Sequence, residues 1–157
     1  MENKAMKRIV VYFVLAALLL SMLPFYGYAN ESGTVCNVVY FEDGSYMVRE
    51  LFVVQTRASG AKTGSKVDTY YTSDGTAEWK VTLTGTFSYT GTSAACTASN
   101  ASVTIYNSNW YTISRNANKS GNAAISSVTM GYKTLGITTN RETSNLTLTC
   151  DKNGNLS

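Results

Sequence analysis

The residues of this 157-residue chain that could carry out chemistry are three cysteines and ten acidic side chains, because histidine is absent. Without imidazole the chain lacks the commonest general base and the commonest metal ligand. Hydrolysis by paired carboxylates needs two of them facing each other across a cleft. The main candidates fall at expected turns or strand ends, and we interpret them as solvated: Asp68, Asp74, Glu78 and Glu142. The sequence therefore predicts no enzyme, no catalytic residue and no cofactor.

One short run imitates half of a metal site. Asp151, Asn153 and Asn155 place oxygen atoms at alternate positions, as the first half of a calcium loop does. Leu156 stands where that loop needs a glycine. We therefore predict a turn here and no metal site.

The aromatic side chains could form a stacking platform for sugar rings. The alternative is that Trp79 and Trp110 fill a core and that tyrosines surround its rim. Tyr70 and Tyr71 are adjacent, so only one of them can face inward from a strand. The outward one of this pair, together with Tyr111, is the best candidate for stacking on a ligand.

Residues 1–29 have the layout of a secretory signal. Three basic residues precede an apolar run at 9–20, and the segment ends in the small residues Gly27 and Ala29. We predict a signal helix that is cleaved after Ala29 and a mature chain that is secreted. An uncleaved membrane anchor is the alternative, but the apolar run is shorter than the roughly 20 residues that a bilayer needs.

Removal of residues 1–29 takes away three basic residues and Glu2, which leaves ten basic and nine acidic residues. A nearly neutral mature chain without a Lys or Arg cluster has no electrostatic footprint for nucleic acid or for an anionic membrane. We expect neither as a partner.

The cysteines are expected to form a disulfide, since an exported chain meets an oxidising environment. Cys96 and Cys150 adjoin alternating apolar segments, so both thiols are expected to point into one core, and we pair them. Cys36 would then be a free thiol or a link between two chains. Three reduced, buried thiols are the alternative.

Alternation of apolar residues with Thr or Ser predicts β-strands throughout the chain after residue 30. The pattern is clearest at 79–90, where Trp79, Val81, Leu83, Phe87 and Tyr89 share one face. Further strands are expected at 67–72, 93–98, 101–105, 110–114, 124–133 and 146–150, with turns at 116–122 and at 135–136. About seven antiparallel strands predict an all-β sandwich, with a small open barrel as the alternative.

Domain boundaries follow from the same scan. Residues 38–54 are typical of a hairpin that turns at Asp43 and Gly44. Residues 55–65 are rich in Ser, Gly, Ala and Lys and are expected to be a flexible linker. We predict an N-terminal part at 30–65 and a β-sandwich domain at 66–157, and the exposed linker offers a site for a second proteolytic cut near Arg57.

Two resemblances bear on fold and origin. The spacing of Cys96, Trp110 and Cys150 resembles that of immunoglobulin domains, although Leu148 replaces the expected tyrosine. This implies an immunoglobulin-like sandwich. The stretch TRASGAKTGSKVDTYYTSDGTAEWK, the later KSGNAA and the ending LTLTCDKNGNLS are similar to a family of small secreted proteins of unknown activity from Gram-positive, clostridia-type bacteria. That resemblance implies an exported protein and assigns no site.

Together these features favour a secreted, non-enzymatic extracellular module that binds a glycan or a protein. A structural or self-associating extracellular protein, joined through Cys36 or an exposed edge strand, is the main alternative. A hydrolase is the second.

Overall fold

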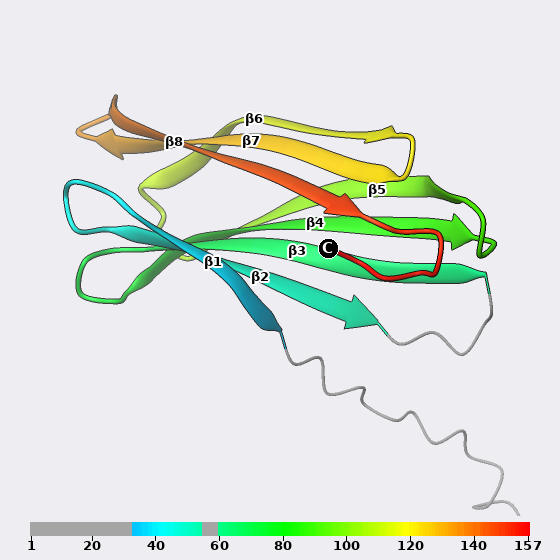
Figure 1. Cartoon of the computed structure of the whole chain (residues 1–157). Helices are drawn as coiled ribbons and strands as arrows, with labels where there is room; N and C mark the ends of the chain where they lie inside the picture. The colour runs from blue at the N-terminus through cyan, green and yellow to red at the C-terminus, as the bar shows by residue number, and fades with distance from the viewer. Residues whose placement is uncertain (1–32, 55–59) are drawn as a thin grey trace, which may run out of the picture. The chain divides into compact units, whose positions relative to one another are not determined.

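The computed structural model describes residues 33–54 and 60–157 and is built from β-strands (Figure 1). The strands are β1 (Thr34–Tyr40), β2 (Tyr46–Val54), β3 (Ala61–Tyr71), β4 (Ala77–Tyr89), β5 (Ala94–Ile105), β6 (Trp110–Ser120), β7 (Ala123–Thr134) and β8 (Ile137–Thr149). They form a five-stranded sheet, β1–β5, and a three-stranded sheet, β6–β8. The predicted all-β fold with antiparallel sheets is confirmed. The predicted signal helix and the cleavage after Ala29 lie outside the described residues.

Both sheets are antiparallel meanders, in which strands that follow one another in the chain are neighbours. Immunoglobulin sandwiches connect their strands as Greek keys. The features shared with them are therefore the two antiparallel sheets and the core between them. No helix in the described part of the chain is long and apolar enough to cross a membrane.

The strands are longer than the alternation pattern predicts. Residues 94–105 form one strand, β5, where two short strands were expected. Strand β6 continues to Ser120, so the predicted turn at 116–122 shrinks to its last two residues. The polar residues of β6 pair with β7 along its whole length, because cross-strand hydrogen bonding outweighs the low strand preference of Asn and Lys.

The prediction of a flexible linker at 55–65 is wrong for residues 61–65, whereas residues 55–59, with the predicted cut near Arg57, lie outside the described residues. Strand β3 begins at Ala61, inside the segment expected to be flexible. Ala61 and Lys62 pair with β4, and from Thr63 onward the strand pairs with both β2 and β4. Small and polar residues are accepted there because both neighbours supply ladder hydrogen bonds. The main body therefore starts before Lys66.

The N-terminal hairpin is confirmed, and it belongs to the larger sheet. Strands β1 and β2 pair with each other, and β2 pairs with β3 from Tyr46 opposite Tyr71 to Val54 opposite Thr63. Residues Glu31–Ser157 form one compact unit. The hairpin and the strands after it thus share one fold.

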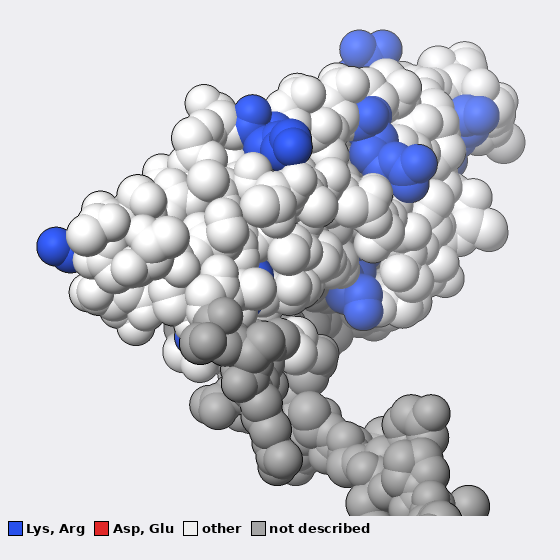
Figure 2. Space-filling view, turned by 90° about the vertical axis from the view of Figure 1, so that its right-hand side faces the viewer, with Lys and Arg blue, Asp and Glu red and all other residues white. Residues whose placement is uncertain are grey.

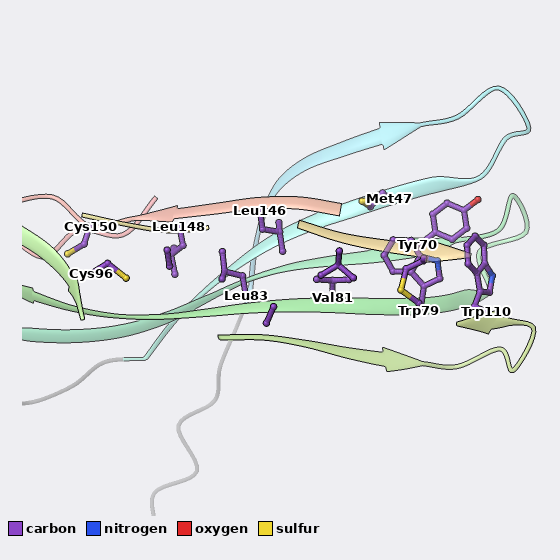
Figure 3. Packing of buried hydrophobic residues seen from close by; sticks show 14 of the residues in the cluster. Met47, Tyr70, Trp79, Val81, Leu83, Cys96, Trp110, Leu146, Leu148 and Cys150 are labelled. Carbon is purple, nitrogen blue, oxygen red and sulfur yellow. The ribbon is translucent and has the colours of Figure 1, made fainter. Parts of the chain in front are cut away.

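The core lies between the sheets (Figure 3). Strand β4 contributes the fully buried Trp79, Val81, Leu83 and Phe87, which supports the prediction of a one-sided apolar face. The smaller sheet contributes fully buried side chains from β7 and β8, among them Met130, Leu146 and Leu148. Trp79 and Trp110 are both part of this cluster, as the core interpretation of the tryptophans expected.

Polar side chains close the core beneath strand β8. Asp68 on β3 is fully buried and accepts hydrogen bonds from Arg49 Nε at 2.7 Å and Nη2 at 2.8 Å, and from Ser144 Oγ at 2.7 Å. Arg49 Nη2 also donates to the Asn145 carbonyl at 3.0 Å, and Lys66 Nζ donates to the Thr147 carbonyl at 2.9 Å. Side chains of one sheet thus cover carbonyl groups on the edge strand of the other, which protects that edge from further pairing.

The prediction for Cys96 and Cys150 is confirmed for their burial and wrong for their pairing. Cys96 and Cys150 both lie in the core, at one end of the cluster in Figure 3, but all three thiols are free. Cys96 Sγ donates to the Ala98 carbonyl and Cys150 Sγ to the Asp151 carbonyl, each close to its own position. Alternation predicts which face a thiol occupies, but not whether two thiols come within bonding geometry. The predicted Cys96–Cys150 disulfide is therefore absent.

Candidate ligand cleft

A cleft of about 240 Å³ opens at the end of the sandwich that carries the β1–β2 and β3–β4 loops and the β5–β6 connection. Three aromatic rings and two carboxylates are among the residues that line it: Asp43, Ser45, Tyr70, Thr72, Ser73, Glu78, Asn107, Trp110, Tyr132 and Asn140. Sites for drug-sized ligands measure roughly 300–1,000 Å³. This cleft is therefore suited to one ring or to the end of a longer chain.

A β-bulge turns Glu78 into the cleft. The register places Tyr70 opposite Trp79 and Tyr71 opposite Ala77, so Glu78 is the extra residue on β4. Glu78 and Trp79 are consecutive, yet both are buried. Bulges often re-aim a side chain in this way next to functional sites.

Hydrogen bonds fix one side of the Glu78 carboxylate. Its Oε2 accepts from Trp110 Nε1 at 2.7 Å and from Asn107 Nδ2 at 2.8 Å. Its main-chain carbonyl accepts from the amides of Tyr106 and Asn107. These bonds tie strand β4 to the β5–β6 connection, so the carboxylate is held in place before any ligand arrives.

A second chain of hydrogen bonds crosses the cleft to the β1–β2 loop. Tyr70 Oη donates to Ser45 Oγ at 2.8 Å, and Ser45 Oγ donates to Asp43 Oδ1 at 2.5 Å. Bonds from Ser45 lower the pKa of Asp43, which keeps this carboxylate charged. Burial raises the pKa of the Tyr70 phenol, and the negative charges of Asp43, Glu142 and Glu78 add to that effect.

Aromatic rings form the rest of the lining. Tyr70 stacks on Trp79 with ring centroids 5.2 Å apart, and the edge-to-face contacts of Trp110 reach Tyr70, Trp79 and Tyr132 at 5.4, 5.9 and 5.3 Å. Trp79 is fully buried, whereas Tyr132 is half-buried and offers ring surface to the cleft. The result is a rigid aromatic floor with polar groups around it.

The three tyrosines predicted to stack on a ligand are spread over the molecule. Tyr70 is the inward member of its pair and lines the cleft, whereas Tyr71 is half-buried on the opposite face of the sheet and stacks on Tyr46 at 5.0 Å. Tyr111 on β6 hydrogen-bonds Thr138 and lies under Lys133 Nζ, 4.2 Å from the ring centroid. The structure brings only Tyr70 into the cleft.

The prediction that the carboxylates are solvated is wrong for two of them. Asp68 is 0% and Glu78 6% exposed. Asp74 does lie in an exposed turn, where Thr72 and Thr76 hydrogen-bond to it. Glu142 is half-buried, and burial is the main cause that raises its pKa. The difference arises because Asp68 acquires a partner from β2 and Glu78 sits in a bulge, and neither feature is visible in local sequence.

The predicted C-terminal turn is present. Asp151 Oδ1 accepts the amides of Asn153 and Asn155, each at 2.8 Å, and this closes the turn on itself. Among the described residues, no group of three or more His, Cys, Asp and Glu side chains is arranged to hold a metal ion.

Sequence reasoning missed most of the cleft. The sequence indicates only a turn role for Asp43 and gives no signal for Asn107 and Asn140, whereas Tyr132 is one of the aromatics that could form a stacking platform. The one available signal was the adjacent Glu78 and Trp79, because a charged residue beside a core tryptophan breaks the alternation. The other residues meet only when loops from both sheets come together at one end.

The fold thus defines an all-β protein of two antiparallel sheets with a polar and aromatic cleft at one end. No protein-family model, curated protein or solved structure matches this chain.

Proposed function

We propose that this protein is a secreted, non-enzymatic module that binds a glycan, and that one sugar ring occupies the end cleft. The observation that carries the proposal is the combination of the aromatic rings of Tyr132 and Trp110 with the fixed polar groups of Glu78 and Asn107 in one cleft. A sugar ring matches this lining, because it also has flat apolar faces and directional polar groups. We also propose an immunoglobulin-like packing of the two sheets, supported by the core position of Trp110 between them, with meander connections in place of Greek keys.

A glycan array followed by calorimetry on the mature chain tests this function. Tyr132→Ala removes one of the rings that line the cleft and should weaken binding at least about tenfold, which corresponds to roughly 1.4 kcal/mol. Tyr71→Ala is the matched control, because Tyr71 is also half-buried but lies on the opposite face of the sheet. Loss of binding in Tyr71→Ala alone would show that the glycan binds on the outer face of the sheet. A glycan array without signal would contradict the proposed glycan-binding function.

Two observations favour self-association through strand β1 as the second candidate function. Strand β1 is an edge strand whose residues are all exposed, including Val38, Val39 and Tyr40 at 37, 46 and 74%. Cys36 lies exposed on the same strand, beside a register shift. An uncharged edge of this kind is a ready template for pairing with another chain.

Light scattering of the mature chain, with and without reductant, tests this second candidate. A dimer abolished by Val39→Lys supports pairing through β1, and a dimer abolished by Cys36→Ser supports the thiol. A monomer under all conditions would leave neither route.

The hydrolase alternative has the weakest support. Asp43 and Glu78 line the same cleft, but Glu78 is engaged by Trp110 and Asn107. Turnover of an oligosaccharide that Glu78→Gln abolishes would overturn the non-enzymatic assignment.

A further inference from the structure

The cleft carries negative charge without a neutralising cation in its lining. Asp43 and Glu78 both line it, and its other lining residues are uncharged at neutral pH. A third carboxylate, the half-buried Glu142, lies near enough to interact with this group: burial and then the charge of Asp43 raise the pKa of Glu142, and Glu142 in turn contributes to the raised pKa of the Tyr70 phenol. The residues that line the cleft therefore carry a net negative charge.

This charge is a property of the cleft and not of the whole protein. Residues 30–157 contain ten basic and nine acidic residues. Figure 2 views the molecule from the side on which the β6–β7 turn and the C-terminal segment lie in Figure 1, away from the β1–β2 and β3–β4 loops. That face displays Lys and Arg side chains and no Asp or Glu (Figure 2).

Glu78 has an unused oxygen. The side chain is more than nine-tenths buried, with 6% exposed, and both of its hydrogen-bond donors use Oε2. Within the described ranges, Oε1 has no hydrogen-bond partner and is not among the side-chain atoms that are both buried and unpartnered, so this oxygen is open to solvent in the cleft. Oε1 is therefore available to a ligand that donates to it, and a positively charged donor would form a charge-assisted hydrogen bond there.

The surrounding rings favour the same kind of ligand. Tyr132 and Trp110 both line the cleft, and their rings are in edge-to-face contact with centroids 5.3 Å apart. Aromatic faces attract ammonium groups through their quadrupoles, and the attraction grows when water is excluded. Carboxylates and aromatic faces together select a cation with an organic body.

We propose that the sugar ring held in the cleft carries a free amino group, as in deacetylated amino-sugar polymers, and that Glu78 and Asp43 receive its ammonium. This inference rests on the proposed glycan-binding function and narrows its substrate class. An N-acetylated sugar has the same ring, but its amide is neutral and leaves the two carboxylates without a counter-charge.

The test compares three tetrasaccharides by calorimetry with the mature chain: β-1,4-linked glucosamine, its fully N-acetylated form and cellotetraose. We expect the glucosamine tetramer to bind at least about tenfold tighter than either neutral probe, and its affinity to fall as salt is raised. Glu78→Gln and Asp43→Asn should each reduce this preference several-fold. Glu42→Gln is the matched control, because Glu42 is adjacent to Asp43 but does not line the cleft.

The outcomes separate the two proposals. Equal or tighter binding of a neutral tetramer would overturn the amino-sugar inference and leave glycan binding intact. An equal loss in Glu42→Gln and Glu78→Gln would overturn it too, since only the overall charge would then matter. Failure of all three tetramers and of the array would reject the function itself. Thermal melts check that Glu78→Gln still folds, and Asp43→Asn, in an exposed loop, provides an independent readout.

Discussion

Arg49 and Asp68 form an ion pair in which Asp68 is buried and Arg49 is partly exposed. The Arg49 side chain is 31% exposed, whereas that of Asp68 is 0% exposed. The two residues come from different strands, and Asp68 also receives a hydrogen bond from Ser144 on β8. This single carboxylate thus links the N-terminal hairpin, the central strands and the second sheet.

Removing the arginine should cost more than removing the aspartate. Arg49→Met leaves a buried carboxylate without its cation, and the free energy of unfolding should fall by about 3–5 kcal/mol. Asp68→Asn should cost less, because Arg49 can turn to solvent. Urea unfolding measures both. Losses below about 1 kcal/mol in each variant would mean that the pair behaves like an exposed salt bridge.

The thiols should differ in reactivity. Burial raises the pKa of Cys96 and of Cys150, and both side chains lie in the core, whereas Cys36 is exposed. Since the thiolate is the reactive form, Cys36 alone should be alkylated in the native protein at neutral pH, and all three cysteines after unfolding without reductant. Peptide mass mapping reports this directly. Protection of Cys96 and Cys150 after unfolding would show that they had formed the disulfide predicted from the sequence.

At the scale of single elements, close packing between the sheets constrains β4. Gly85 lies opposite Ser99, and a Cβ atom there would meet the Phe87 ring at 2.7 Å and the Ala124 Cβ at 3.0 Å. Both neighbours belong to the core cluster. Glycine is needed at this position because the Phe87 ring of the same strand and Ala124 of the second sheet both approach closely, and not because of its backbone angles.

Gly85→Ala should therefore destabilise the fold by about 1–3 kcal/mol, as overpacking does. Ser99→Ala is a control on the paired strand, because the Ser99 hydroxyl is buried without a hydrogen-bond partner. Its loss should change stability by less than about 0.5 kcal/mol. Chemical denaturation compares the two variants, and equal effects would contradict the packing argument.

At the scale of the whole molecule, the N-terminal hairpin is part of the fold. Met47 on β2 is 6% exposed in the common core, and the ion pair of Arg49 with Asp68 crosses from β2 to β3. Beyond β2, the edge strand β1 is exposed on every residue. The hairpin thus serves both as a wall of the core and as the uncovered edge of the larger sheet.

A chain that starts at residue 58, as a cut near Arg57 would produce, should be less stable than one that starts at residue 30. It loses the burial of Met47 and the partner of Asp68, so its thermal midpoint should fall by at least about 10 °C. Melting followed by circular dichroism measures this. Equal midpoints would show that 58–157 is an independent domain, as the predicted linker implied.

The sequence by itself determined what depends on neighbours along the chain. Alternation at 79–89 fixed the strand and its buried face, Asp43 and Gly44 fixed the hairpin turn, and the adjacency of Tyr70 and Tyr71 required one of them to face inward. These features follow from the two-residue period of a strand and from turn chemistry, which are local.

Only the tertiary structure decided which distant groups meet. Residues 61–65 became strand because two neighbouring strands supplied hydrogen bonds, and Glu78 turned inward because β3 and β4 differ by one residue in their pairing. Asp68 was buried because Arg49 and Ser144 reached it from other strands. The cleft has the same origin, since its lining is assembled from loops of both sheets. Pairing register and sheet packing are non-local, so composition and spacing carry no record of them.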